Sequence, residues 1–307
     1  MPVLKPPRKA ALAAIIAVSV LTSCGTSPSQ EGPKEDLTTP NWPERMDNFR
    51  FRWTSEPGID LTTGESVPLR AYLESWLAIS YTNNQKSGYP GYDRATPAYV
   101  EPWTPEWLAL PQANRMTHAF LGGPEQDQQQ MYGHEDLHVL QIDPIPNGFR
   151  SFVCDATFSA YRKMPDNESF IPLKAELSST AQKADNANMD VWRIEFSTEG
   201  PTTARAPKSP TQPQRGPLPA PTGDVFGPWF VTGFQSVKSW VDSDHRDLAP
   251  DSQEIKTLES EARGVEESMR QRCLDRYPAS AAQRLRSAST ALRSPPPVEP
   301  AEPGWPE

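Results

Sequence analysis

The chain has 307 residues, of which 35 are proline, and its formal net charge is −9. Proline is about twice as frequent as in ordinary proteins and the mean hydropathy is −0.64, so part of the chain must lie outside a globular core. The acidic balance also excludes a general nucleic-acid binder, because such proteins gather Lys and Arg on one face and this sequence has no basic stripe.

The first 23 residues have the pattern of a secretory signal peptide. Lys5, Arg8 and Lys9 carry the charge of the N-terminal segment, and residues 10–21 are almost wholly apolar. A membrane-spanning helix needs about 20 apolar residues, so this run is too short to be one. We therefore predict a signal peptide at residues 1–23.

The apolar run ends in Leu21-Thr22-Ser23-Cys24, in which a branched apolar residue and two small residues precede a cysteine. This segment resembles the lipobox of bacterial lipoproteins. Together with the long Pro-rich segments, it makes the chain similar to actinobacterial envelope lipoproteins of uncharacterised function. The resemblance implies cleavage before Cys24, a diacylglyceryl thioether on its sulfur and an acyl chain such as palmitate on its new amino group. The alternative is an ordinary signal peptide with an incidental cysteine.

Lipid, rather than the protein surface, is expected to hold the mature chain at a membrane. Two or more acyl chains anchor a protein stably. Removing residues 1–23 takes away three positive charges and no negative ones, which changes the net charge from −9 to −12. A chain this acidic is repelled by an anionic bilayer. We therefore expect a protein anchored through Cys24 at the extracytoplasmic face of the cell membrane.

The folded body is expected to begin near residue 46. Residues 24–45 are polar and Pro-rich, which favours a flexible tether. Residues 49–53 then alternate aromatic and polar side chains, as a short strand does. Residues 68–81 are predicted to form a helix, because Pro68 suits a first helical turn and apolar residues follow at helical spacing: Leu69, Tyr72, Leu73, Trp76 and Leu77.

Residues 88–111 combine five prolines with five aromatic residues, Tyr89, Tyr92, Tyr99, Trp103 and Trp107. Regular helices and strands do not tolerate this density of proline, so we predict a long ordered loop. Its aromatic side chains either cover an edge of the core or offer a stacking surface to a sugar, lipid or peptide. These five residues are the candidate ligand-binding residues.

The segment His134-Glu135-Asp136-Leu137-His138 has the spacing H-E-x-x-H. On a helix this spacing brings both imidazoles within reach of one zinc ion and places the glutamate beside a water molecule. The motif resembles that of zincin metallopeptidases. The charged Asp136 inside the motif and the lack of a third downstream histidine depart from those families.

The local sequence argues against a metal site. Residues 137–142 read as a strand, in which two residues four apart are separated by about 13 Å. Zinc ligands lie about 2.1 Å from the metal, so His134 and His138 could share an ion only on a helical turn. We therefore expect no metal and no other cofactor. A lipid-anchored zinc metallopeptidase using His134, Glu135 and His138 is the alternative function.

Further strands are predicted in the second half of the chain. Residues 137–161 resemble a hairpin with its turn at Asn147-Gly148, and residues 189–196 alternate in the manner of a strand. Residues 225–241 are apolar but contain Gly227 and Gly233, which favours a bent strand or a hairpin over a helix.

Residues 201–223 hold seven prolines and have the composition of a linker between domains. Cys154 and Cys273 lie on either side of this segment, and in an oxidising compartment we expect them to pair. Such a bridge would close a loop of 119 residues, from 154 to 273, and contribute about 4–5 kcal/mol in the chain-entropy model. Residues 201–223 are then an exposed excursion from a single domain. The alternative is two buried free thiols.

The C-terminal part is predicted to be helical and then disordered. Residues 252–276 form a predicted helix, capped by Asp251 with Glu254 three residues later, and Pro278 ends it. Ser280 is predicted to cap a short helix within residues 278–293. Residues 294–307 are rich in proline and are predicted to be a disordered tail.

The predicted fold class is α+β. We expect a single domain at residues 46–277, with an antiparallel sheet packed by a few helices, together with Pro-rich disordered segments. A helix followed by several antiparallel strands resembles the cone-shaped folds of the NTF2-like kind. This is an analogy of fold and carries no function.

No P-loop, dinucleotide-binding fingerprint, complete nucleophile elbow or S-x-x-K motif occurs in the chain. We therefore expect a non-catalytic ligand-binding, partner-binding or scaffold role. The expected partners are the membrane, through lipid on Cys24, and an envelope protein or a small apolar or glycan ligand. Nucleic acid is not an expected partner.

Overall fold

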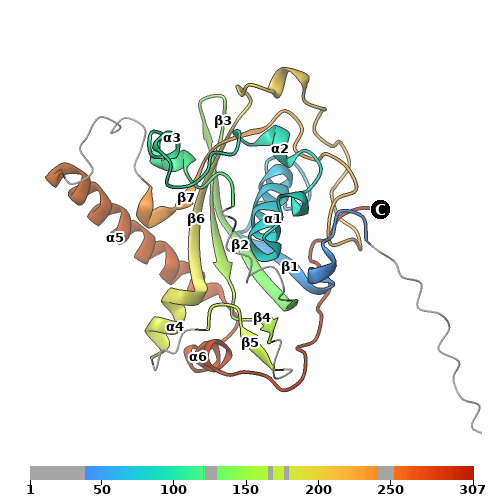
Figure 1. Ribbon diagram of the computed structural model, residues 1–307, viewed down its shortest axis with the longest axis vertical. Helices are drawn as coiled ribbons and strands as arrows, with labels where there is room; N and C mark the ends of the chain where they lie inside the picture. Colours follow the sequence, from blue (N-terminus) through green and yellow to red (C-terminus); the bar gives the residue numbers. More distant parts are fainter. Residues whose placement is uncertain (1–38, 120, 122–129, 165–168, 176–179, 241–251) are drawn as a thin grey trace, which may run out of the picture. The chain divides into compact units, whose positions relative to one another are not determined.

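The computed structural model describes residues 39–119, 121, 130–164, 169–175, 180–240 and 252–307 (Figure 1). These residues belong to one compact unit, Thr38–Glu307. The predicted signal peptide, Cys24 and the tether up to residue 38 lie outside the described residues. No described helix has the length and apolar character needed to cross a membrane.

Helices and strands are mixed along the chain without a repeating unit. The strands are β1 (Asn48–Ser55), β2 (Met131–Ile145), β3 (Gly148–Ala156), β4 (Ala160–Lys163), β5 (Phe170–Pro172), β6 (Met189–Ser197) and β7 (Phe230–Ser236). The helices are α1 (Ser66–Thr82), α2 (Tyr92–Ala95), α3 (Pro105–Leu108), α4 (Ala181–Asn188), α5 (Gln253–Arg276) and α6 (Ala281–Ser289). Single 3-10 turns are η1 (Glu44–Met46), η2 (Gln85–Ser87), η3 (Gln112–Asn114), η5 (Thr203–Arg205) and η6 (Val237–Ser239).

The seven strands form one sheet in the order β5-β4-β2-β3-β6-β7, and β1 pairs with the free edge of β2. Neighbouring strands run antiparallel, which confirms the predicted sheet, except that β1 is parallel to β2. A parallel pair requires a crossover connection. Here the connection runs between residues 55 and 131 and contains α1, which the sheet curls around (Figure 1). The single α+β domain and its cone-like arrangement are therefore confirmed.

Two positions depend on left-handed backbone, one in a turn and one inside a strand. Asn147, with φ 57°, occupies the tight turn between β2 and β3, which confirms the predicted hairpin. Gly133 has φ 85°, and a Cβ added there would lie 2.1 Å from the carbonyl oxygen of Ser159. This close approach lets β4 continue beside β2 where β3 has ended.

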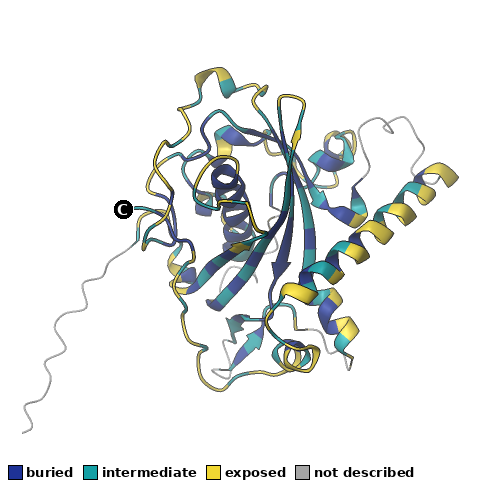
Figure 2. Cartoon of the chain, turned by 180° about the vertical axis from the view of Figure 1, so that it is seen from behind, coloured by how far each residue is buried: buried dark blue, intermediate teal, exposed yellow. Residues whose placement is uncertain are grey.

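The sheet separates two hydrophobic clusters. The larger one gathers the apolar side chains of α1 with the inward residues of the strands, such as Phe49 and Phe196. The smaller one lies on the opposite face and includes Met189 and the two cysteines, Cys154 and Cys273. Figure 2 shows the deep burial of α1 and the exposed surface of much of α5.

The predicted helix at residues 68–81 is confirmed as α1. Two charged residues of this helix, Arg70 and Glu74, are buried along with its apolar side chains. Glu74 is 2% exposed, and three donors from distant segments reach its carboxylate. Trp53 donates at 2.7 Å, Tyr89 at 2.9 Å and Trp305 at 2.8 Å. Burial raises the pKa of Glu74, whereas Arg70 and these donors act in the opposite direction.

Arg70, one turn earlier on α1, is fully buried and lies 3.8 Å from Glu74. Its guanidinium donates to the carbonyl oxygens of Leu61 and Gln214, each at 3.0 Å, and of Pro303 at 2.5 Å. It also lies over the ring of Trp305, 4.1 Å from the centroid. One buried ion pair therefore holds together five segments: β1, the segment before α1, the aromatic loop, the Pro-rich segment and the tail.

The predicted disorder of residues 294–307 is wrong. Trp305 is 1% exposed and its backbone pairs with Leu218. The carbonyl oxygen of Glu302 accepts a hydrogen bond from the amide of Trp53, so the tail continues the sheet beside β1. Proline-rich composition predicts poor helix and strand formation, but the buried indole of Trp305, the two backbone pairings and the contacts of Arg70 order the segment.

The predicted excursion at residues 201–223 is exposed in its first half, whereas its second half mixes exposed and buried residues. Residues 201–213 are mostly accessible, whereas Gln214 and Ala220 are buried. The prediction is wrong for the second half because Gln214 and Leu218 belong to the contacts that hold Arg70 and the tail.

The C-terminal helices are confirmed as α5 and α6. The N-cap of α5 is Ser252, whose side chain accepts from the amide of Ile255, and the predicted cap Asp251 lies outside the described residues. Ser280 caps α6 in a capping box with Gln283, as predicted. The strand at residues 189–196 is β6, and the predicted bent strand at 225–241 is β7 followed by a 3-10 turn.

Trp305→Ala should destabilise the domain by about 3–5 kcal/mol, because it removes a buried indole and leaves Glu74 without one donor. The measurement is thermal or denaturant unfolding. Val298→Ala is the control in the same segment, since Val298 is 43% exposed and its truncation should cost no more than about 0.5 kcal/mol. Equal stability of the two variants would contradict the packing role of the tail.

Candidate functional site

The H-E-D-L-H segment lies in β2, and the alternation of the strand separates its side chains. Glu135 is fully buried and faces α1, whereas His134, Asp136 and His138 lie on the opposite face. The predicted strand is confirmed, and the glutamate and the two imidazoles do not converge as a zinc peptidase requires. Among the described residues, no group of three or more His, Cys, Asp or Glu side chains is placed to hold a metal ion.

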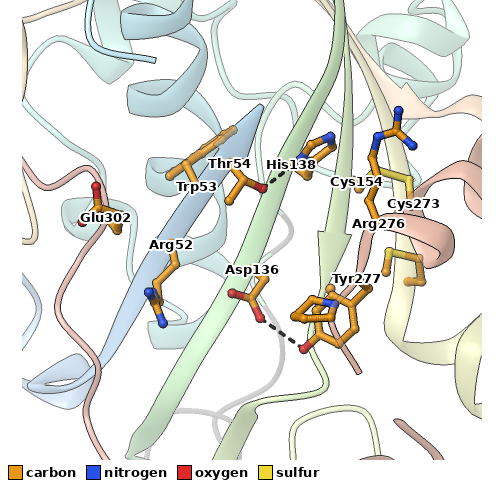
Figure 3. Close-up of a pocket in the computed structure, with 13 residues that line it drawn as sticks. Arg52, Trp53, Thr54, Asp136, His138, Cys154, Cys273, Arg276, Tyr277 and Glu302 are labelled. Carbon is orange, nitrogen blue, oxygen red and sulfur yellow. Dashed lines mark hydrogen bonds between the residues drawn. A yellow bond between two sulfur atoms is a disulfide. The ribbon is translucent and has the colours of Figure 1, made fainter. Parts of the chain in front are cut away.

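A cavity of about 260 Å³ lies on the face of the sheet that carries Asp136 and His138 (Figure 3). Strand register decides which side chains form its floor, because residues on the same rung point to the same face. One rung aligns Arg52, Asp136, Ala156 and Met189 across β1, β2, β3 and β6. The neighbouring rung aligns Thr54, His138 and Cys154.

The C-terminal end of α5 covers this floor. Arg276, Tyr277 and Pro278 line the cavity from above, and Glu302 of the tail closes one side. The predicted disulfide is confirmed: Cys154 of β3 is bonded to Cys273 of α5, with 5.8 Å between their Cα atoms. The disulfide therefore joins the sheet, which forms the floor of the cavity, to α5, which covers it, and both cysteines line the cavity.

His138 is held between two groups from β1 and the segment after it. Its Nδ1 lies 2.8 Å from the hydroxyl of Thr54, and its Nε2 lies 3.8 Å from Glu56. Glu56 is itself in contact with Arg276, which lowers the pKa of this carboxylate. Burial lowers the pKa of His138, and the positive charge of Arg276 lowers it as well, whereas Glu56 raises it. The net effect is a lowered pKa, so the imidazole is neutral at pH 7.

Asp136 and Arg52 carry the remaining charge of the floor. Tyr277 donates to Oδ2 of Asp136 at 3.1 Å, and Nε2 of His134 lies 3.5 Å from the same oxygen. Arg52 lies 3.8 Å from Glu299 of the tail. The side chains of Arg52 and Asp136 are 34% and 32% exposed, so both can contact a molecule in the cavity.

A second polar cluster lies on the inner face of the sheet, sealed from solvent. The hydroxyl of Tyr81 lies 2.8 Å from both carboxyl oxygens of Glu135, and Trp192 donates to Asp155 at 2.9 Å. Glu135 and Asp155 are 0% and 1% exposed. Burial raises the pKa of Glu135 well above its ordinary value, and Asp155 raises it further. Glu135 therefore holds a proton under conditions in which exposed carboxylates are ionised.

The predicted aromatic loop splits into buried and exposed side chains. Tyr89 and Tyr92 are buried in the core, so they cannot belong to an open stacking surface. Trp107 is also buried, but it lines a small pocket of about 60 Å³ together with Tyr99. Tyr89 donates to Glu74, and Tyr92 stacks on Tyr72 at 5.9 Å. Only Tyr99 and Trp103 are accessible, at 39% and 77%. Buried hydrogen-bond acceptors and aromatic partners, which the loop sequence does not reveal, hold the other three in the core.

Sequence reasoning missed most of the cavity. His138 and the two cysteines were singled out, but Arg52, Asp136 and Tyr277 were not assigned to a site. The polar residues that alternate with aromatics in β1, and the position of Tyr277 four residues after a paired cysteine, were the signals available. The parallel register of β1 on β2, which brings these signals together, has no sequence signature.

Comparisons with known proteins supply no identity for the site. No family model matches the chain, and no curated protein and no solved structure is significantly similar to it. The function must therefore be argued from the residues described above.

Glu135→Gln should remove a pH dependence of stability. The pKa of Glu135 is higher in the folded protein than its ordinary value of 4.5, so the folded state binds the proton more tightly than the unfolded state does. The protonated carboxyl therefore stabilises the fold fully below pH 4.5, and this contribution is lost as the pH rises through the folded-state pKa. Wild-type melting temperature should therefore fall from about pH 5 to about pH 8, relative to the variant, by several degrees. In a domain of this size about 1 kcal/mol corresponds to about 2–4 °C.

The control for this comparison is Glu106→Gln, which changes an exposed carboxylate in α3. Its melting temperature should follow that of the wild type at every pH. A Glu135→Gln variant with the same pH profile as the wild type would show that the buried carboxyl is ionised in the folded protein.

Proposed function

We propose that the protein is a lipid-anchored binding protein of the extracytoplasmic face of the cell membrane, and that it holds a small ligand in the disulfide-walled cavity. The anchor is supported by the lipobox-like residues Leu21-Thr22-Ser23-Cys24, which follow a charged and then an apolar segment. The acidic mature chain would be repelled by anionic lipid, so retention at the membrane depends on acyl chains on Cys24.

The cavity is the observation that supports a binding role. Ligand sites are concave and largely apolar, with a few polar groups that fix the orientation of the ligand. Here Ala156, Met189 and the disulfide supply apolar surface, and Arg52 and Asp136 supply charge (Figure 3). The volume of about 260 Å³ lies just below the range of drug-sized pockets, so the ligand is a small molecule rather than a polymer.

The arrangement around His138 favours binding over catalysis. Thr54, His138 and Glu56 follow one another as a hydroxyl, an imidazole and a carboxylate do in a catalytic triad. In this case Arg276 pairs with the carboxylate and adds its charge to the burial that lowers the pKa of His138. The imidazole is therefore a weak base, and its role is to fix the wall of the cavity.

Cys24→Ser should release the protein from membranes. Without the thiol no thioether can form, and the acidic chain has no other means of attachment that its sequence indicates. The measurement is fractionation of cells, together with the intact mass of the membrane-extracted wild-type protein, which should show lipid on a chain beginning at Cys24. An extracted chain without lipid mass would contradict the anchor.

Ala156→Leu should abolish ligand binding at the cavity by filling its floor, at an expected cost in stability of about 1–3 kcal/mol. The measurement is calorimetric titration of the soluble domain with small alcohols, amines, carboxylates and amino acids. Ala204→Leu is the matched control, since Ala204 is exposed in η5. Binding that Ala156→Leu removes and Ala204→Leu retains would support the proposal, and the absence of any saturable binding to the wild type would overturn it.

A further inference from the structure

We infer that the ligand of the disulfide-walled cavity is a small zwitterion of the size of an amino acid, with its carboxylate on Arg52 and its ammonium on Asp136. This inference rests on the proposed binding function and specifies the class of ligand. It follows from the register of two strands, the partners of the charged groups around the cavity and the size of the space between them.

The parallel pairing of β1 with β2 places Arg52 directly beside Asp136 on one rung. Both residues line the cavity, because register partners on one rung point to the same face of the sheet. A guanidinium and a carboxylate on neighbouring strands would ordinarily pair with each other. Instead, the nearest carboxylate to Arg52 is Glu299, 3.8 Å away, and the donor to Asp136 is Tyr277.

The contacts of Asp136 leave one side of its carboxylate directed toward Arg52. Tyr277 donates to Oδ2, and His134 lies near the same oxygen. Figure 3 shows the other oxygen on the side of Arg52, across the floor of the cavity. A bound molecule between these two side chains would meet one positive and one negative group within a single rung.

The other charged residues of the cavity have closer partners. Arg276 is in contact with Glu56, and Glu302 accepts from Arg215 at 2.8 Å. Arg52 has only a distant carboxylate partner, and both contacts of Asp136 are on one oxygen. These two residues are therefore the charged pair best placed to bind a ligand. A ligand with one charge would satisfy one of them and desolvate the other, which is costly, whereas a zwitterion satisfies both.

Size and wall chemistry complete the assignment. The cavity volume of about 260 Å³ lies just below the range of drug-sized ligand pockets, so it suits a molecule smaller than a drug. An α-amino acid with an apolar side chain has about this size. Its charged end would lie on the rung of Arg52 and Asp136, and its side chain would face Met189, Ala156 and the disulfide.

The test is calorimetric titration of the full-length mature chain with leucine and with three analogues that lack one or both charges. Leucinamide lacks the carboxylate, 4-methylpentanoate lacks the ammonium, and 4-methylpentanol lacks both. Leucine should bind at least tenfold more tightly than each analogue. Arg52→Gln should remove the preference for leucine over leucinamide, and Asp136→Asn should remove the preference over 4-methylpentanoate.

Two variants control for charge and fold. Arg50→Gln changes the arginine one rung away on β1, and Asp143→Asn changes an aspartate near the far end of β2; neither residue lines the cavity. Both variants should bind leucine as the wild type does. Melting temperatures of all four variants report whether each one folds.

The outcomes separate this inference from the proposed function. If an analogue with one charge or none binds as tightly as leucine, and Ala156→Leu abolishes that binding, the cavity is a ligand site but the zwitterion inference is wrong. If leucine binds but the preferences survive in Arg52→Gln and Asp136→Asn, the assigned contacts are wrong. If neither these probes nor the small alcohols, amines and carboxylates named above bind the wild type, the proposed binding function itself is overturned.

Discussion

The buried ion pair on α1 is the interaction on which the rest of the fold depends. Burying two charges is costly unless hydrogen bonds satisfy them. Glu74 obtains its donors from β1, the aromatic loop and the tail, and Arg70 obtains its acceptors from the segment before α1, the Pro-rich segment and the tail. The cost of burial is offset only when all of these segments are in place, so irregular, proline-rich parts of the chain become as fixed as the sheet.

This explains which parts of the fold could be predicted from the sequence. Periodicity and turn residues indicated α1, the β2–β3 hairpin, β6 and the C-terminal helices, because these elements are stabilised by neighbours in the sequence. Composition predicted disorder for the tail and exposure for the Pro-rich segment. Trp305 and Gln214 are ordered instead by Arg70 and Glu74, which lie more than 140 residues away. No local pattern records such a contact.

Part of the candidate site could also be predicted from the sequence. The disulfide could be predicted from the cysteine count and the expected oxidising compartment, and it links α5 to the sheet. The strand character of residues 134–138 was also readable, and it separates the histidines from Glu135. The cavity requires in addition that β1 enter the sheet parallel to β2, since this register puts Arg52 and Thr54 beside Asp136 and His138. This register joins residues 84 positions apart in the sequence, and no local pattern specifies it.

The contacts of Arg70 with residues 303 and 304 also bear on the order in which the chain can fold. These contacts span 233 and 234 positions in the sequence. A chain that emerges from its N-terminal side presents α1 early, while the groups that satisfy Arg70 and Glu74 are still to come. Contacts of this separation slow folding, because a long loop must close before they form. The domain therefore remains incompletely folded until residue 305 is available, so the buried ion pair acts as a check that the whole chain is present.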